Sequence, residues 1–504
     1  MSIRFSFKPE EANVVTHSGN FHADDIFCLV LMEKILGSLV VFRSNSIYFD
    51  VNNFNPDAII FDIGYGKFDH HQKDGNGYHP NNDPTLKPIP YASFGLLWKE
   101  FGHRFCMDIT NNNSTLASKL WDEMEYNFVI GIDAIDNGIY SFTPEAYQSH
   151  RTLSISNIIS LFNSYNNNGE NNQDALNQAL FFARLVFDVT IDRILCRLTG
   201  RKMSFKDNPK FFTANMVFSF ALLNKIYPNS SEKNLSNLES WNNDTFMEHE
   251  PSQTSKDFFK KPIPAATLGK IWNTLGVNYC STLFNPNEAI YVANFVRSYL
   301  IMGIDANTNG IFAYSNPEYV SHNIMTITHF IESLNPIEYS EEAYNNCWYV
   351  ATKLAQLIIN RVEAKAFDRV QGKRYVETKI KEAFNITSDC MVTPTGSTTN
   401  ILVLDRHVHW QDWIATSPLA KKIYFVISPS NKGGYIIQPV PCKYNENGFR
   451  KGFPSTWYGL HGDELKKITN ISTANFVHRK NGFIGAADDL IGAVEMAKLA
   501  CETI

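Results

Sequence analysis

The sequence has little of what marks secreted or membrane-spanning proteins. Its eight cysteines are scattered singly among 504 residues, without a CxxC pair, whereas small secreted domains stapled by disulfides are dense in cysteine. No apolar run reaches the roughly 18 residues that indicate a membrane span. The opening residues MSIRFSFKPEEANVV include Glu10 and Glu11 and have no apolar core of signal-peptide length. We therefore expect a reducing compartment, cytoplasm or nucleus, with no mitochondrial presequence evident and no membrane partner.

An excess of positive charge is also lacking. The chain has 45 basic and 51 acidic residues, which gives a formal net charge of −6. This balance argues against broad electrostatic binding along a nucleic-acid duplex, although a local basic groove is compatible with it. With a hydrophobic content of 44%, a chain of this length can bury a sizeable core. We expect a globular protein of two or three domains.

Strand-like and helix-like segments alternate in the first part of the chain. The strand-like segments are rich in apolar residues, and an amphipathic, helix-like segment lies between the first two. Apolar strands separated by helices are typical of a parallel sheet, so we predict an α/β domain here. The predicted strands are residues 13–17, 39–44 and 58–64, and the predicted helix is residues 24–36.

One stretch of the chain occurs twice. KPIPYASFGLLWKEFG at 87–102 returns as KPIPAATLGKIWNTLG at 261–276. GIDAIDNGIYSFTPEAYQSH at 131–150 returns as GIDANTNGIFAYSNPEYVSH at 303–322. Because the two matching stretches keep nearly the same spacing in both places, we infer that one α-rich module is duplicated. A long helical pattern follows in each copy, at residues 175–198 and 342–370.

The composition between and after the copies indicates the domain organisation. Residues 228–260 are polar, rich in Asn and Ser and without periodicity, as in a linker. Later, the runs NILVLD, KIYFVIS and GYIIQPVP predict strands, and AADDLIGAVEMAKLACETI from Ala486 predicts a helix. We predict a catalytic domain at 1–227 that contains the first copy from residue 87, a linker at 228–260, a second, degenerate copy at 261–385 and a C-terminal α+β domain at 386–504.

Aspartate and histidine gather where three apolar runs end. In a parallel α/β sheet, the carboxyl end of a strand is where ligands bind. The first group follows the strand at 13–17, the second follows the apolar part of the strand at 58–64, and the third follows the apolar run at 128–130. The members of the three groups are His17, His22 and Asp24; Asp62, Asp69, His70 and His71; and Asp133 and Asp136.

The donor atoms of these groups indicate a metal centre. Imidazole nitrogen and carboxylate oxygen, without thiolate, suit Mn²⁺ or Mg²⁺ better than structural zinc. The groups exceed what one ion needs, and two ions about 3.5 to 4 Å apart would create a hydroxide nucleophile near neutral pH and hold a phosphoryl group. Single members could instead cap helices, as we expect for Asp25. Burying the whole set without a cation would be strongly destabilising, so we favour a two-metal phosphoesterase.

The same motifs carry a family resemblance. THSGNFHADD at 16–25, DHHQ at 69–72 after FDIG, and GIDAIDNG at 131–138 resemble the DHH phosphoesterase superfamily, specifically its melanocyte-proliferating-gene (Myg) branch. The C-terminal stretch at 440–498, which includes RKGFPSTWYGLHG and FVHRKNGFIG, is similar to the same branch. The resemblance covers most of the chain outside the duplication.

This resemblance implies a fold, an activity and a set of site residues. The implied fold is α/β: a DHH-type parallel-sheet N-terminal domain and a smaller C-terminal α+β domain, with the active site in the cleft between them, here joined by the duplicated α-rich middle module. The implied activity is that of a Mn²⁺- or Mg²⁺-dependent hydrolase, most simply a 3′–5′ exonuclease acting on RNA or a short oligonucleotide. The implied metal ligands are His17, His22, Asp24, Asp62, His70 and Asp136, to which we add Asp133 from the same motif. Asp62 would bridge two ions, His71 would face the scissile phosphate, and Asp69 would orient its neighbouring histidine or serve as a ligand.

The C-terminal region contains the predicted substrate-binding residues. Arg450 and Lys451 are a guanidinium and an ammonium beside glycine and proline, suited to holding phosphate. His478 could donate a hydrogen bond to the same group. Gly482 and Gly485 would let backbone amides approach an anion. This role rests on the resemblance as much as on the residues.

The second copy departs from the first at one candidate ligand. Asp305 matches Asp133, but Thr308 stands where the first copy has Asp136, and neither HADD nor DHHQ recurs. We therefore expect the first copy to complete the metal centre and the second to have a packing or partner role. Two other functions stay open, namely hydrolysis of small phosphoanhydrides or dinucleotides, and a non-catalytic scaffold whose cleft the duplication occludes. The oligomeric state also stays open.

Overall fold

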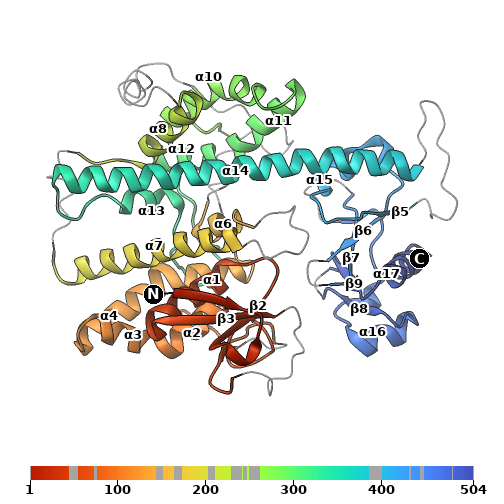
Figure 1. The fold of residues 1–504 in the computed structure, drawn as a ribbon, viewed down its shortest axis with the longest axis horizontal. Helices are drawn as coiled ribbons and strands as arrows, with labels where there is room; N and C mark the ends of the chain where they lie inside the picture. The colour runs from red at the N-terminus through yellow and green to blue at the C-terminus, as the bar shows by residue number, and fades with distance from the viewer. Residues whose placement is uncertain are drawn as a thin grey trace. The chain divides into compact units, whose positions relative to one another are not determined.

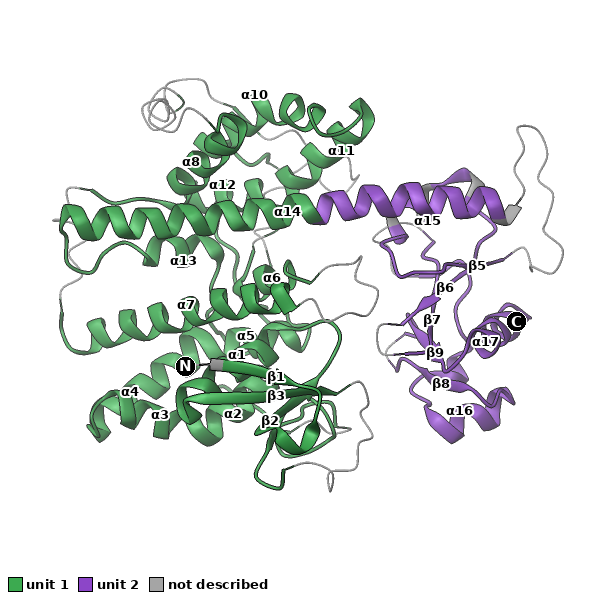
Figure 2. Ribbon diagram, viewed as in Figure 1, with its two compact units in different colours: residues 1–163, 172–364 green, residues 164–171, 365–504 purple. Residues whose placement is uncertain are grey.

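The computed structural model describes most of the chain. The described residues are 2–44, 55–72, 76–142, 151, 153–163, 173–201, 210–228, 241, 247–248, 261–384, 400–430, 433–442, 448–479 and 481–502. The chain divides into two compact units, residues 1–163 with 172–364 and residues 164–171 with 365–504 (Figure 2). The predicted linker at 228–260 lies outside the described residues except for residues 228, 241, 247 and 248.

A four-stranded sheet, of which Figure 1 labels β2 and β3, opens the first unit. Its order is β1 (Ser2–Ser6), β3 (Ser38–Ser44), β2 (Val14–His17) and β4 (Ile59–Ile60). All neighbouring strands are parallel, which confirms the predicted parallel sheet. The last strand is shorter than the predicted 58–64, because Asp62 has a φ of 57°, in the left-handed region that strand pairing excludes.

Helix α1 (Ala23–Leu36) follows β2 and confirms the predicted helix. The carboxylate of Asp25 accepts the backbone N–H of His22 at 3.1 Å, which satisfies a donor at the start of the helix. Asp25 thus caps the helix from its third position, whereas we expected it to be the N-cap, which is His22. Gly37 ends the helix with a φ of 79°, a conformation that glycine adopts without steric cost.

Helices form most of the rest of the described part of the first unit. The helix α7 (Gln173–Leu198) lies alongside α1 (Figure 1), and its Arg184 forms a two-pronged ion pair with the buried Glu33 at N–O distances of 2.6 and 3.1 Å. An edge-to-face pair of Phe27 and Phe128, with ring centroids 4.9 Å apart, joins α1 to the first copy. The other α-helices of this unit that are used below are α2 (Ser93–Leu97), α4 (Ser114–Met124), α5 (Ile130–Asp136), α6 (Ile155–Ser160), α8 (Ala214–Ile226), α10 (Thr267–Ser281), α11 (Pro286–Val296), α12 (Met302–Thr308), α13 (Ile327–Ser333) and α14 (Glu341–Phe384), whose residues from 365 onward belong to the second unit.

The two matching stretches of the chain have matching helix boundaries. We call residues 87–160 the first copy and residues 261–333 the second copy, and we align them by pairing Gly131 with Gly303. In the first, α4 is followed by the π-helical segment η4 (Glu125–Val129) and by α5; in the second, α11 is followed by η5 (Arg297–Ile301) and by α12. Each of these elements begins at the position that aligns with the start of its counterpart.

The copies also touch each other at matching positions. Backbone bridges join Phe142 to Tyr314 and Ser154 to Thr326, and both bridges link positions that align between the copies. Contact between equivalent positions is the property of a two-fold, isologous interface. The two copies therefore pack around an approximate two-fold axis within one chain.

The second unit contains a mixed five-stranded sheet. Its order is β5 (Ile401–Val403), β6 (Phe425–Pro429), β7 (Tyr435–Pro439), β9 (Gly485–Ala487) and β8 (Ala474–Val477), with only the β5–β6 pair parallel. The predicted helix from Ala486 begins later, as α17 (Leu490–Glu502), because Ala486 pairs with strands on both sides. In the part of the chain that the structure describes, no helix combines the length and the apolarity needed to cross a membrane.

Candidate metal centre

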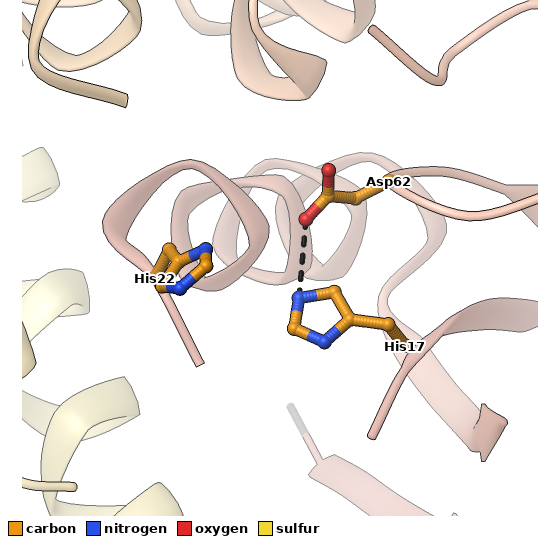
Figure 3. A group of neighbouring side chains, drawn as sticks. All are labelled: His17, His22 and Asp62. Atoms are coloured by element: carbon orange, nitrogen blue, oxygen red, sulfur yellow. Dashed lines mark ion pairs between the residues drawn. The ribbon is translucent and has the colours of Figure 1, made fainter. Parts of the chain in front are cut away.

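The elements of the first unit bring most of the predicted ligands together. His17 ends β2 and Asp62 follows β4, so both stand at the carboxyl edge of the parallel sheet. His22 is the N-cap of α1, and Asp24 lies in its first turn. Asp136 ends α5 of the first copy. Figure 3 shows His17 and Asp62 turned toward each other, with His22 beside them.

His17 lies between two carboxylates. Its Nδ1 is 2.8 Å from the carbonyl oxygen of Ser18, an acceptor, so the proton sits on Nδ1 and Nε2 is left for other partners. Nε2 lies 2.9 Å from Asp25 Oδ2 and 3.1 Å from Asp62 Oδ2. Burial alone would lower the pKa of His17, but the hydrogen bonds to Asp25 and Asp62 raise it to about 10. This edge of the imidazole thus faces an environment that favours positive charge.

His70 faces three carboxylates across the centre. Its Nε2 is 3.2 Å from Asp136 Oδ2, and its Nδ1 is 3.6 Å from Asp62 Oδ1 and 3.9 Å from Asp24 Oδ2. Burial, together with the neighbouring His71, lowers the pKa of His70. A neutral imidazole is the form that binds metal ions, so His70 is suited to be a ligand.

Asp24 is the most deeply buried charge of the group. Its exposed fraction is 0%, and neither of its carboxylate oxygens accepts a hydrogen bond. Burial, followed by repulsion from Asp136 and Asp62, raises its pKa well above the usual range. The same two causes, burial and the charge of Asp62, raise the pKa of Asp136 to about 7. A buried carboxylate without a partner is strongly destabilising, and a cation bound among these oxygens would remove that penalty.

The donor set fits divalent ions. Three groups place ligand atoms within 4.8 Å of one another, namely His17, His22 and Asp62; Asp62, His70 and His71; and His22, Asp24 and Asp136. Asp62 belongs to two of these groups and His22 to two, so neighbouring ion positions would share ligands. Nitrogen and oxygen donors of this kind suit Mn²⁺ and other divalent ions of similar preference.

The carboxylate of Asp69 accepts hydrogen bonds from neighbouring residues of its own loop. Its Oδ1 lies 2.8 Å from His71 Nδ1 and accepts the backbone N–H of His71 at 3.0 Å, while its Oδ2 accepts the N–H of Tyr65 at 2.7 Å. Burial would lower the pKa of His71, but the hydrogen bond to Asp69 raises it. Of the two roles that we considered for Asp69, this geometry favours orienting His71 over ligating an ion.

Asp133 is not brought into the centre by the structure. Its carboxylate accepts the backbone N–H groups of Ala92 at 2.8 Å and Gly95 at 3.1 Å, at the start of α2. Its Oδ2 is also 2.9 Å from Nε2 of His79, whose Nδ1 lies 2.7 Å from Glu125 Oε1. Burial lowers the pKa of His79, but the hydrogen bonds to Asp133 and Glu125 outweigh it and raise this pKa to about 9. With these partners Asp133 has a structural role, so we leave it out of the ligand set proposed below.

The structure places three residues at the centre that the sequence-based prediction did not include. Ser93 donates its hydroxyl to Asp62 Oδ1 at 3.1 Å. Tyr140 and Arg151 line a cavity of about 570 Å³ that His22 and Asp136 also line. The guanidinium of Arg151 lies 4.2 Å from the ring centroid of Tyr299, which belongs to the second copy. A comparison of the two copies would have drawn attention to Arg151. The first copy has a cation at this position, whereas the second copy has the neutral Asn323 at the matching position.

The predicted substrate-binding cations lie in the second unit. The guanidinium of Arg450 donates hydrogen bonds to the carbonyl oxygens of Ala420 at 2.5 Å, Ile423 at 3.2 Å and Ile414 at 3.0 Å. These carbonyls tie the loop after β7 to the segment before β6, so Arg450 has a clear structural role. Lys451 is partly exposed. The ring of His478 lies 4.4 Å from that of Phe483.

The two predicted anion-binding glycines are explained by packing. A Cβ atom on Gly482 would lie 2.4 Å from the Tyr458 ring, and Gly482 has a φ of 61°. A Cβ atom on Gly485 would lie 2.8 Å from the Phe453 ring. Both positions therefore require glycine because aromatic side chains occupy the space.

Comparison with known sequences gives one family. A family model named for the MYG1 exonuclease, and described as an uncharacterised protein family (UPF0160), matches residues 13–211 and 242–501. The MYG1 protein YER156C of Saccharomyces cerevisiae is 24% identical over 266 residues, which cover 49% of this chain and 75% of that protein. The MYG1 protein C694.04c of Schizosaccharomyces pombe is 31% identical over 164 residues, which cover 30% of this chain and 47% of that protein.

A human relative is named for an activity. The human MYG1 exonuclease is 30% identical over 139 residues, which cover 25% of this chain and 35% of that protein. The chain thus spans between about a third and three quarters of the length of these relatives. No solved structure matches the chain.

Proposed function

Since the chain belongs to the MYG1 exonuclease family (UPF0160), we propose that it is a divalent-metal-dependent phosphoesterase that removes nucleotides from the 3′ end of RNA. The observation that carries the proposal is Asp24, a fully buried carboxyl group whose oxygens accept no hydrogen bond from an N–H donor and which lies among further carboxylates and an imidazole. Nuclease chemistry agrees with the printed name of the human relative. The 3′–5′ direction and the preference for RNA come from the family resemblance of the motifs.

Six side chains would hold the ions. We expect two ions, which are either Mn²⁺ or Mg²⁺. When bound, such ions lower the pKa of a water molecule and neutralise charge on a phosphoryl group. Asp62 would bridge the two positions because it belongs to two of the three ligand groups. Ser93 and Ser18 would hold Asp62 and His17 in place through hydrogen bonds at 3.1 and 2.8 Å. The six ligands are His17, His22, Asp24, Asp62, His70 and Asp136.

Two cationic side chains would bind the substrate phosphate. His71 is directed by Asp69, which occupies its Nδ1 and leaves Nε2 to donate a proton or a hydrogen bond. Arg151 projects from an exposed position beside the cavity that Asp136 lines, and a guanidinium suits phosphate oxygens. His71 would contact the scissile phosphate, and Arg151 would hold a neighbouring phosphate or the terminal one.

The domain plan that we propose is that of the DHH phosphoesterases. In this plan residues 1–227 form the catalytic domain, with the first copy supplying Asp136, and residues 386–504 form the substrate-binding domain with Lys451 and His478. We interpret residues 261–385, which include the second copy, as a degenerate duplicate of the first module. It keeps the capping aspartate at Asp305 and has Thr308 in place of the ligand Asp136.

Substitution of Asp24 by asparagine tests the metal centre. Asp24→Asn keeps the shape of the side chain and removes its charge, so we expect Mn²⁺-dependent hydrolysis of a labelled single-stranded RNA to fall by at least about 100-fold. Calorimetry should show weakened Mn²⁺ binding. Without metal the variant should be as stable as the wild type or more stable, because an unpaired buried charge has been removed. The exposed Asp57 offers a control, and Asp57→Asn should behave like the wild type in all three measurements.

The choice of substrate completes the test. RNA labelled at its 5′ end should yield a ladder that shortens with time if nucleotides leave from the 3′ end. A dinucleotide and pyrophosphate serve as alternative substrates. Faster turnover of either one than of the RNA would contradict the exonuclease assignment. Unchanged hydrolysis by Asp24→Asn would contradict the metal centre itself.

A further inference from the structure

A second cavity lies within the second copy, next to the cavity of the metal centre. It has a volume of about 240 Å³, and the two cavities share Ser141. Several of its lining residues align, between the two copies, with residues that line the first cavity. These pairs are Ile135 and Asn307, Tyr140 and Phe312, Arg151 and Asn323, Ser154 and Thr326, and Asn157 and His329. The duplication has thus left a second cavity that has lost the charged groups of the first.

Two buried acceptors line this cavity without a partner. The exposed fractions of His322 and Asn307 are 5% and 7%, and neither Nε2 of His322 nor Oδ1 of Asn307 has a hydrogen-bond partner. Nδ1 of His322 lies 2.8 Å from the carbonyl oxygen of Val320, so Nδ1 carries the proton and Nε2 is an acceptor. Burial lowers the pKa of this histidine, which keeps the ring neutral. Buried acceptors without donors are costly, so a ligand that donates hydrogen bonds would be stabilised here.

The chemistry of the lining excludes several kinds of ligand. Among the described residues, none of those that line the cavity is Asp, Glu, Lys or Arg. A hard divalent ion such as Mg²⁺ or Ca²⁺ would lack carboxylate ligands, and a phosphate would lack cations. The volume is below the roughly 300 to 1,000 Å³ of sites for drug-sized ligands, so it suits a single ring system. The fitting ligand is a flat, neutral group that bears an amino donor.

Exposed aromatic side chains connect the two cavities. Phe142 and Tyr314 form a backbone bridge and lie with their rings 6.3 Å apart at an angle of 27°. Tyr140 lines the first cavity and Phe312 lines the second. The exposed fractions of these four aromatic residues are 45% to 61%. Adjacent exposed aromatic rings beside a cavity are typical of a surface on which nucleic-acid bases stack.

We propose that the second cavity binds a base of single-stranded nucleic acid whose end is held at the metal centre. The strand would pass from Asp136 over Tyr140, Phe142 and Tyr314 and place one base against Phe312. The acceptors His322 and Asn307 would receive hydrogen bonds from the amino group of adenine or cytosine, which uracil lacks. This inference rests on the proposed nuclease function and adds a subsite, remote from the reacting phosphate, that favours longer strands and amino-bearing bases.

Substrate length separates this subsite from the catalytic centre. We expect Phe312→Ala to raise the KM for a twelve-residue oligoadenylate about 10-fold, since one base–aromatic stack has an effect of this order. Turnover of a diadenylate, which is too short to reach the subsite, should stay at the wild-type rate. Phe181→Ala removes a comparably exposed ring on α7 that lines neither cavity, and it should change neither value.

Binding without hydrolysis gives an independent measurement. Fluorescence anisotropy in EDTA should show tighter binding of twelve-residue oligoadenylate than of oligouridylate to the wild type. This preference should vanish in Phe312→Ala and in His322→Phe, which removes the acceptor. If the wild type hydrolyses RNA but both variants keep the wild-type length dependence and base preference, the subsite is overturned while the nuclease function stands. If the wild type hydrolyses nothing, the proposed function fails, and the base preference of the variants still decides the subsite.

Discussion

The first and second copies have helices with matching boundaries, but the matching helices α5 and α12 end in different residues. In the first copy, α5 ends at Asp136, whose carboxylate lies 3.2 Å from Nε2 of His70. In the second copy, α12 ends at Thr308, whose hydroxyl donates to the carbonyl of Ile304 in its own helix at 2.9 Å. The two helices thus begin and end at matching positions, but only the helix of the first copy ends in a carboxylate that faces the candidate metal centre.

A second pair of matching positions, Asp133 and Asp305, carries an aspartate in both copies. Asp133 accepts the backbone N–H of Ala92 at 2.8 Å, and Asp305 accepts that of Ala266 at 2.9 Å, in both cases at the start of the helix that opens the copy. A further partner differs between the copies, because Asp133 Oδ2 lies 2.9 Å from Nε2 of His79, whereas Asp305 accepts the side-chain amide of Asn215 at 2.8 Å. Both copies need this carboxylate to satisfy buried donors, so its presence reports on folding and not on catalysis.

The largest expected effect on activity concerns Asp136 and Thr308, the residues that end α5 and α12. Asp136→Asn should reduce Mn²⁺-dependent hydrolysis by at least about 100-fold, because it removes a proposed ligand. Thr308→Val at the matching position should leave the rate unchanged. Initial rates on one short RNA compare the two variants, and equal losses would mean that the second copy also completes an active site.

The capping aspartates should affect stability in both copies. We expect Asp133→Asn to lower the free energy of unfolding by about 3 kcal/mol, because it weakens several buried hydrogen bonds and removes the counter-charge of His79. Asp305→Asn should cost about 1 to 2 kcal/mol, because the two donors described above, the backbone N–H of Ala266 and the amide of Asn215, are neutral. Urea unfolding monitored by circular dichroism gives both values. Loss of Mn²⁺ affinity in a folded Asp133→Asn protein would return Asp133 to the ligand set.

His79, the charged partner of Asp133, should make the stability of the protein depend on pH. Because the pKa of His79 is about 9 in the folded chain and 6.5 is its ordinary value, the stabilisation is complete below pH 6.5 and is lost as the pH rises through 9. The difference in unfolding free energy between the wild type and His79→Gln should shrink by about 3 kcal/mol over this range. Urea unfolding at several pH values measures it, with Asn215→Ala as the second-copy control, whose effect should not vary with pH. A constant difference for His79→Gln would show that the histidine is neutral.

The smallest expected effect concerns Arg151, whose matching residue in the second copy is the neutral Asn323. Arg151→Asn copies the residue of the second copy and should raise the KM for RNA about 10-fold with little change in kcat, since it removes a phosphate contact and no proposed ligand. Steady-state kinetics at fixed Mn²⁺ would separate the two constants. A fall in kcat with an unchanged KM would place Arg151 at the reacting phosphate instead.

Local patterns were sufficient where neighbouring residues decide the outcome. The parallel sheet, α1, and the long helices α7 and α14 follow from runs of apolar residues and their periodicity. The helix expected from Ala486 begins only at Leu490, because Gly485–Ala487 pair with two strands, one of which, β7, is distant in the sequence, and this pairing overrides helical propensity.

The sequence by itself determined the chemistry of the candidate centre, since the identity of His17, Asp24, Asp62 and the DHHQ motif sets which ions can bind. Only the tertiary structure decided which carboxylates face that centre. Asp133 and Asp136 stand close together on one short helix, yet one meets the start of α2 and the other meets His70. Arg450 likewise carries a charge that suits phosphate, and its position among three carbonyl oxygens gives it a structural role. A side chain's type fixes what it can bind, whereas its partners depend on segments that folding brings together from far along the chain.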